Sequence, residues 1–162
     1  MYFQNLEIIQ NLDGEFNEKI IKDLDYWLAT RREAVKDYLN PYNFSDYADV
    51  SIDVVLPLFF ICTSKKVEIL KERYDILIKQ ENKFIASYYN HENIPDEIIH
   101  PETNEAYKLN KEEDIRLYFE LISEPESKPV FIKKSSGKDQ GVGLTMALEA
   151  KQKASFAMSD LI

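Results

Sequence analysis

The fold is decided by residues 41–62, which read PYNFSDYADVSIDVVLPLFFIC. This stretch contains two helix starts. Asn43 or Ser45 can cap a short helix over FSDYADV, because both side chains can accept a hydrogen bond from an unpaired backbone N–H group. Ser51 can cap a second helix, in which Asp53 is favourably placed in the first turn. The stretch therefore predicts two helices separated by a tight turn.

The second of these helices is apolar around most of its circumference. One face carries Val55, Leu58, Phe59 and Cys62, and other positions carry Ile52, Leu56 and Phe60. Pro57 removes a backbone hydrogen bond, so we expect a kink or an early end there. A helix that is apolar on nearly all sides is usually buried, which predicts a core helix; the alternative is a helix docked on a partner.

A longer helix is predicted before this stretch. Residues 15–39 place apolar side chains at spacings of three and four, with charges on the other face. The pattern starts after Asp13-Gly14 and stops at Asn40-Pro41, where the proline pushes the preceding residue out of helical geometry. We therefore expect one long amphipathic helix before the two short ones.

Extended segments are predicted after the third helix. VEILKERYDILI (67–78) and FIASYY (84–89) form the simplest hairpin. AYKL (106–109) and IRLYFELI (115–122) predict a second small β unit. In the latter segment Ile115, Leu117, Phe119 and Leu121 alternate onto one face. SEPESKP is a linker by composition, KKSSGKDQGVG is a flexible basic stretch, and a last amphipathic helix runs from about residue 143 to 159.

The order of long helix, short helix, turn, third helix and charged hairpin resembles a winged helix-turn-helix. In such proteins the third helix reads bases with Arg, Lys, Asn or Gln side chains. Residues 41–62 contain no basic residue, which disfavours base reading. Lys65, Lys66, Lys71 and Arg73 are the candidate contacts with a nucleic-acid backbone, and the alternative is that they line the solvated side of a strand.

The next stretch resembles the small zinc ribbon that follows a winged helix in many prokaryotic proteins and is built from two CPxCG knuckles. LIKQENKFIASYY, NIPDEII, HPETNEAYKL and EEDIRLYFELI occur in the order of that ribbon, with knuckles at residues 78–82 and 100–104. The ligand positions hold Ile78, Glu81, His100 and Thr103. Only His100 and Glu81 could bind zinc, whereas a structural site needs four ligands. The resemblance implies a degenerate ribbon without metal or other cofactor, with a core of Phe84, Tyr88, Tyr107, Leu117 and Phe119.

The expected fold is therefore α+β, with a winged-helix domain over residues 1–83, a degenerate zinc-ribbon-like β unit over 84–124, and a linker and C-terminal helix over 125–162. Proteins that combine these modules occur as transcription regulators. They also occur as small middle components of bacterial multi-subunit systems, including three-component ABC-ATPase antiphage defences. The resemblance thus implies either of two roles.

Charge and composition favour the second role. The net charge of −9 disfavours nucleic acid as the main partner, because affinity for phosphates rests on Lys and Arg. Residues 92–126 hold eleven acids against three bases, so any contact with a polyanion would be local. The single cysteine, Cys62, offers no disulfide framework, and neither a signal peptide nor a membrane span is predicted. We expect a cytosolic protein that does not bind membranes.

No catalytic motif is found. The sequence lacks GxSxG, a Gly-rich phosphate loop, HExxH and a cysteine with a credible histidine partner. His91 and His100 are more typical of surface or turn residues than of catalytic bases, and the acids at Asp96-Glu97 and 112–114 are more typical of solvated turns than of a metal-dependent nuclease. We predict that the chain is not an enzyme; an enzyme of unfamiliar type would need a cleft with convergent acids.

The last helix is the predicted partner-binding element. Leu144, Leu148, Phe156 and Met158 are its candidate contact residues, and the alternative is that the helix packs back on the long N-terminal helix. We expect an adaptor subunit that holds a larger ATPase or effector in a hetero-oligomer. The alternative function is a DNA-binding regulator that uses the basic hairpin.

Overall fold

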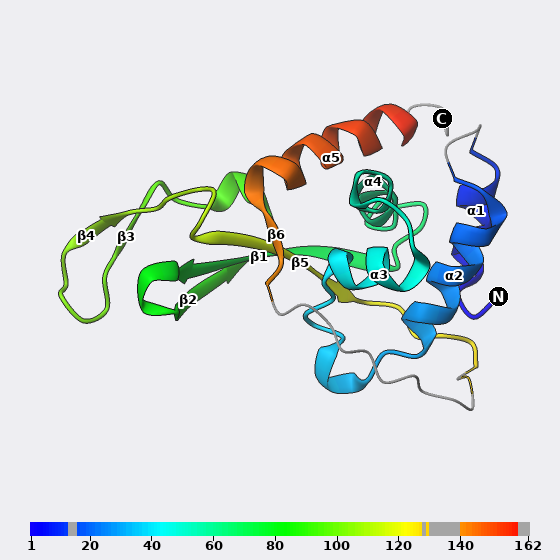
Figure 1. Ribbon diagram of the computed structural model, residues 1–162, viewed down its shortest axis with the longest axis horizontal. Helices are drawn as coiled ribbons and strands as arrows, with labels where there is room; N and C mark the ends of the chain where they lie inside the picture. Colours follow the sequence, from blue (N-terminus) through cyan, green and yellow to red (C-terminus); the bar gives the residue numbers. More distant parts are fainter. Residues whose placement is uncertain (13–15, 128, 130–139, 159–162) are drawn as a thin grey trace.

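The computed structural model describes residues 1–12, 16–127, 129 and 140–158. It is a mixed α+β fold, as expected, in which helices cover one face of a four-stranded sheet and a two-stranded arm extends away from the body (Figure 1). The winged-helix assignment stays a prediction. Residues 130–139, which hold most of the expected basic stretch, lie outside the described residues.

The expected long helix is shorter than predicted. The N-terminal part contains a short α1 (Glu7–Gln10) and α2 (Glu18–Ala29). Asn17 caps α2 by accepting from the Ile20 N–H at 2.8 Å. At the other end the Trp27 carbonyl accepts from Thr30 Oγ1 at 3.0 Å and from Arg31 Nε at 2.8 Å. Both side chains bond to the Trp27 carbonyl, which would accept from a backbone N–H group if the helix continued. The helix therefore ends here.

After α2 the chain turns towards the sheet. It passes through a single 3₁₀ turn at Glu33–Val35, and Leu39 then forms a bridge with Phe119 in which both backbone N–H groups donate across the pair. Leu39 is buried. A continuous helix over residues 15–39 could not have placed Leu39 beside a strand.

Helix α3 (Pro41–Ala48) begins earlier than predicted. Asn40, not Asn43 or Ser45, is the cap: its side chain accepts from the Tyr42 N–H at 3.1 Å, and Pro41 fills the first helical position, where its missing N–H has no cost. Ser45 instead donates to the Val50 carbonyl in the turn that follows. Asp49 ends the helix in the left-handed region, at φ 54°.

Helix α4 (Ile52–Ile61) confirms the prediction of a core helix. Ser51 caps it by accepting from the Asp53 N–H at 3.2 Å. Pro57 lies inside the helix, which continues beyond it, and every residue from Val55 to Ile61 is buried. Trp27, Phe44 and Phe59 form one aromatic cluster, with ring centroids 5.4–6.1 Å apart, and Phe119 joins it from the sheet at 5.3 Å from Phe59.

The main sheet has the strand order β2-β1-β5-β6. Its strands are β1 (Leu70–Ile78), β2 (Lys83–Tyr88), β5 (Ile115–Leu121) and β6 (Val142–Gly143). The predicted hairpin is confirmed, since β1 and β2 are antiparallel neighbours. The arm is a separate two-stranded sheet of β3 (Glu97–Ile99) and β4 (Ala106–Lys108).

Strand β5 does not belong to a second small β unit as predicted. It pairs with β1 over its whole length, from Leu70 opposite Leu121 to Ile76 opposite Ile115. The expected apolar face is correct, because Leu117 and Phe119 are fully buried, and Phe119 packs against Phe59 and Phe60 of α4. Strands on both sides of the expected boundary at residues 83 and 84 therefore share one sheet. The division into three domains stays a prediction.

The predicted C-terminal helix is confirmed as α5 (Leu144–Met158), and it packs along α4 rather than on the N-terminal helix. Val142 and Gly143 form β6 and so belong to the sheet, although they fall within the stretch expected to be flexible. A Cβ atom on Gly141 would lie 2.4 Å from the Leu117 carbonyl oxygen, so only glycine permits β6 to approach β5 this closely. None of the helices in the described ranges has the length and hydropathy needed to cross a membrane.

Candidate functional site

Helix α5 is held against α4 by small side chains. Ala147, Ala150 and Ala154 are buried along one side of it, and their size lets the two helices approach closely. Lys151 ties the same helix to the sheet: its Nζ donates to Glu72 Oε1 at 2.7 Å and lies 3.3 Å from Nδ1 of His91. The helix is thus fixed by packing and by an ion pair.

The four predicted contact residues on α5 have different environments. Leu144 is buried in the core and cannot contact a partner in this conformation. Leu148 and Met158 are half-buried, and the Phe156 side chain has a relative exposure of 70%. The structure therefore brings Phe156 and Met158 to the surface at the end of the helix and assigns Leu144 to the core.

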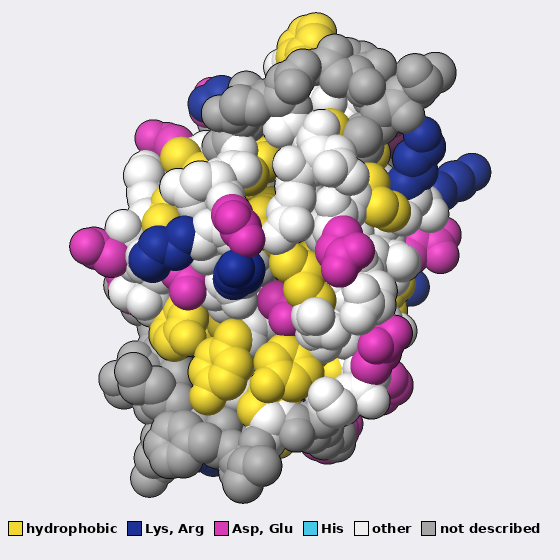
Figure 2. Space-filling model, turned by 90° about the vertical axis from the view of Figure 1, so that its right-hand side faces the viewer, with side chains coloured by type: hydrophobic (Ala, Val, Ile, Leu, Met, Phe, Trp, Pro, Cys, Tyr) yellow, Lys and Arg dark blue, Asp and Glu magenta, His cyan; other side chains and the backbone are white. Residues whose placement is uncertain are grey.

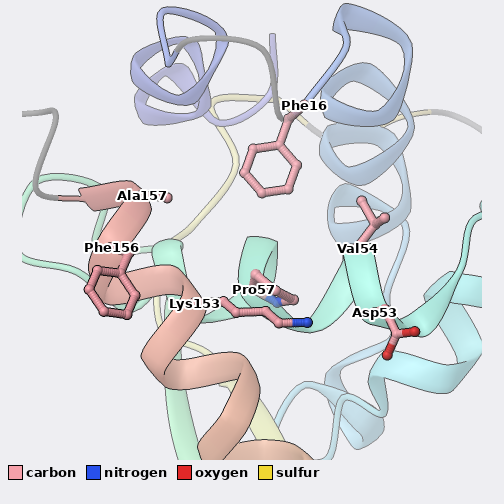
Figure 3. A pocket seen from close by; sticks show the side chains of 7 residues that line it. All are labelled: Phe16, Asp53, Val54, Pro57, Lys153, Phe156 and Ala157. Atoms are coloured by element: carbon pink, nitrogen blue, oxygen red, sulfur yellow. The ribbon is translucent and has the colours of Figure 1, made fainter.

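Two grooves flank this end of α5. The larger, with a volume of about 690 Å³, lies between α4, α5 and the segment before α2 (Figure 3). It is lined by Phe16, Asp53, Val54, Pro57, Lys153, Phe156 and Ala157. The smaller, of about 420 Å³, lies on the other side and is lined by Phe60, Thr63, Ser64, Lys151, Ala154, Ser155 and Met158. We call them the Phe156 groove and the Met158 groove.

These grooves could not be predicted from sequence patterns. Asp53 and Pro57 were recognised only as local features of a helix, and Phe16 and Lys153 carried no signal at all. Their proximity depends on how α4, α5 and the N-terminal segment pack. The contact of Lys151 with Glu72 and His91 was missed for the same reason, because it joins three separate elements.

The four basic candidates near the hairpin are not equivalent. Lys65, Lys66 and Lys71 are exposed, and the Lys71 ammonium lies 4.0 Å from the centre of the Tyr89 ring. Arg73 is buried, contrary to the expectation of a solvated side chain.

Internal partners explain the burial of Arg73. Its guanidinium bonds Asp75 at 2.9 Å, Glu120 at 3.2 Å and the Tyr38 hydroxyl at 2.7 Å. These contacts direct its donors into the outer face of the sheet, so the exposed basic set consists of the three lysines.

The two segments expected as knuckles contact each other. His100 is buried, and its Nε2 lies 2.7 Å from Glu81 Oε2. Its Nδ1 accepts from the backbone N–H groups of Glu102 at 3.1 Å and Thr103 at 3.3 Å. Because Nδ1 is an acceptor, the ring carries its proton on Nε2 and donates it to the Glu81 carboxylate. A charge-assisted hydrogen bond thus joins the two segments.

Both segments also end in the same backbone conformation. Asn82 and Asn104 have φ angles of 49° and 57°, in the left-handed region. These are the positions at which the CPxCG pattern has glycine, and asparagine is among the few other residues that adopt this conformation readily. Ile78, at the first ligand position, is buried.

Asp114 joins the first of these two segments, residues 78–82, to the arm. It is buried, and its carboxylate accepts from the backbone N–H groups of Lys79 at 3.1 Å and Asn110 at 2.8 Å and from the Tyr107 hydroxyl at 3.0 Å. Burial and this hydrogen bond raise the pKa of Tyr107 above its ordinary value. Within the described part of the chain, no three or more His, Cys, Asp or Glu side chains form a group that could hold a metal ion.

Two further titratable side chains, on Cys62 and Tyr74, are buried. Cys62 is fully buried, and burial raises the pKa of its thiol far above the ordinary value. Tyr74 is also buried, and its pKa is raised first by burial and then by the nearby Glu72 carboxylate. Phe84, expected in a ribbon core, is half exposed on the edge strand β2.

Comparison of the chain with protein-family models, with curated proteins and with solved structures gave no match.

Proposed function

We propose that this chain is a non-catalytic accessory subunit that binds a larger protein, an ATPase or effector, through the exposed end of α5. One observation carries the proposal: a helix fixed to the core ends in an exposed aromatic side chain, Phe156, between two grooves. Exposed aromatic side chains on a rigid support are the usual anchors of protein interfaces. The protein would then act within a hetero-oligomer.

The Met158 groove is the better site for the larger partner. It is mainly apolar along Phe60, Ala154 and Met158 and carries hydroxyl groups on Thr63 and Ser64. The Ser64 hydroxyl oxygen is buried and has no hydrogen-bond partner among the described residues. A partner side chain that supplied an acceptor or donor there would remove an unsatisfied polar atom.

Further support comes from surfaces away from α5. Figure 2 shows the face that carries α1 and α2, where hydrophobic side chains gather in the lower part between charged ones. Such areas on an acidic protein are better suited to protein contacts than to nucleic acid. The burial of α4 also removes the element that would read bases in a winged helix-turn-helix.

The paired knuckle segments support the resemblance to middle components of bacterial multi-subunit systems. Both segments end in the left-handed backbone conformation, at Asn82 and Asn104, and the contact between Glu81 and His100 joins them. This arrangement is the one expected of a zinc ribbon that keeps its shape without metal. A role in antiphage defence, beside an ABC ATPase, is the specific form of the proposal that this resemblance suggests.

The proposal is tested by co-expressing the tagged chain with the products of its neighbouring genes. We expect a larger subunit to co-purify in a fixed ratio. Met158→Glu should abolish this co-purification while leaving the melting temperature of the isolated chain unchanged. The matched control is Glu149→Lys, an exposed charge change on the same helix. If Met158→Glu retains the subunit as the control does, the assigned surface is wrong.

DNA binding remains the second candidate function, because Lys65, Lys66 and Lys71 are exposed together near the hairpin. A gel shift at physiological salt distinguishes the two. A specific complex that is lost in the Lys65→Glu, Lys66→Glu double variant would replace the adaptor proposal with a regulator.

A further inference from the structure

The Phe156 groove has two walls of opposite character. Asp53, Val54 and Pro57 from the start of α4 form one wall, and Lys153 and Phe156 from the end of α5 form the other. Figure 3 shows the Lys153 side chain extending from α5 past Pro57 with its ammonium on the side of Asp53. Phe16, from the segment before α2, and Ala157 complete the lining.

Neither charge in this groove has an ion-pair partner within the described part of the chain. Among the described residues, no acidic group lies within salt-bridge distance of Lys153 and no basic group lies within that distance of Asp53. The other lysine on this helix, Lys151, is paired with Glu72. The groove therefore offers one free carboxylate and one free ammonium on facing walls, with an exposed aromatic ring beside the ammonium.

We propose that a second copy of this chain occupies the Phe156 groove in a two-fold symmetric dimer. Lys153 and Phe156 are three residues apart on a helix and so project from the same face. In the dimer, this face of each copy packs on the α4 wall of the other. Phe156 packs on Val54 and Pro57 in the α4 wall of the partner copy, and Lys153 pairs with Asp53 of the partner copy. The same two contacts form twice, as an isologous interface requires.

Charge explains why the occupant is a second copy. Two chains of net charge −9 repel each other over most of their surfaces. At this groove an acid on one wall balances a base on the other, so the two walls are complementary in charge.

This inference goes beyond the proposed function and shares one residue with it, Phe156, which the dimer would bury. The Met158 groove lies on the other side of α5, so a dimer leaves it open for a different protein. Failure of the dimer would not affect co-purification of a larger subunit, and loss of that subunit in Met158→Glu would not affect dimerisation.

The test is sedimentation equilibrium of the purified full chain over a range of protein concentrations. We expect the wild type to form dimers. Asp53→Lys and Lys153→Asp should each weaken the dimer by about tenfold or more, because each places like charges opposite each other twice. Phe156→Ser should weaken it as well, and the control Glu149→Lys should not.

An equimolar mixture of the Asp53→Lys and Lys153→Asp chains provides the decisive measurement. Each contact between the two variants again joins a lysine to an aspartate, so the mixture should form heterodimers although neither variant dimerises alone. A salt bridge within one chain would give no rescue. Melting temperatures near that of the wild type confirm that the variants are folded.

Three outcomes would overturn the proposal. The wild type could be monomeric at the highest concentration, the single charge variants could dimerise like the control, or the mixture could remain monomeric. In each case the groove does not hold a second copy.

Discussion

Single residues show how closely the helical layer and the sheet depend on each other. Phe119 lies at the centre of β5, is fully buried, and packs edge-on against Phe59 and Phe60 with ring centroids 5.3 and 5.2 Å away. Its backbone also pairs with Leu39. One side chain therefore contacts the core helix while its backbone holds the segment between α2 and α3.

Replacing Phe119 by Ala should destabilise the whole described fold, by about 3–5 kcal/mol, because it removes buried contacts and leaves a cavity. The measurement is urea denaturation monitored by both circular dichroism and fluorescence. The two signals should shift together, since Phe119 belongs to the shared sheet. Loss of stability confined to one signal would indicate that β5 belongs to a separate unit after all.

Cys62 should make stability depend on alkaline pH. In the folded chain its raised pKa keeps the thiol protonated, whereas the unfolded thiol ionises near its ordinary value of about 8.5. Above that pH the unfolded state binds fewer protons than the folded state, so the free energy of unfolding falls as pH rises, by up to about 1.4 kcal/mol per unit.

The free energy of unfolding of wild type and Cys62→Ala, measured by urea titration between about pH 8 and pH 10, tests this. The alanine variant is expected to be less stable but to have a shallower slope over this window. Equal slopes would show that the thiol does not govern the alkaline loss of stability.

Elements differ in whether local sequence determines them. The capping of α4 by Ser51, its burial and the β1–β2 hairpin could be predicted, because each rests on residues that are close in sequence. The end of α2 could not, since it depends on where the Thr30 and Arg31 side chains find an acceptor. Nor could the pairing of β5 with β1, because an alternating apolar face does not specify which strand lies beside it.

The knuckle segments should bind no metal in stoichiometric amount. Ile78 and Thr103 offer no suitable ligand, and the Glu81 carboxylate already accepts from His100. Elemental analysis of the purified protein is expected to find far less than one zinc per chain. One zinc per chain, released only on unfolding, would contradict the metal-free interpretation.

Helix α5 should divide into a part that stabilises the fold and a part that serves binding. Ending the chain after Gly143 removes Leu144 and three buried alanines, so we expect a loss of at least about 2 kcal/mol in the free energy of unfolding. Phe156→Ser should change that free energy by less than about 0.5 kcal/mol, because its side chain is exposed. Chemical denaturation of both variants measures the difference. Equal losses would mean that the exposed end also stabilises the fold.

At the scale of the whole molecule, the candidate surfaces arise where distant segments meet. The Phe156 groove joins residues from before α2, from α4 and from α5. Sequence patterns identified α5 as an amphipathic helix with Phe156 and Met158 near its end, yet they placed Leu144 among the contact residues although it belongs to the core. Periodicity predicts which face of a helix is apolar. Which element covers that face depends on the packing of the whole chain.

The central position of β1 also bears on how the protein is made. Tyr74 and Ile76 of β1 are buried in the core and pair opposite Leu117 and Ile115 of β5, which follows roughly forty residues later in the chain. At ribosomal speeds this interval corresponds to roughly two to eight seconds of synthesis. During that time β1 and β2 form a hairpin with an open edge and an unfinished apolar face, which is the period in which a nascent chain most needs protection from aggregation.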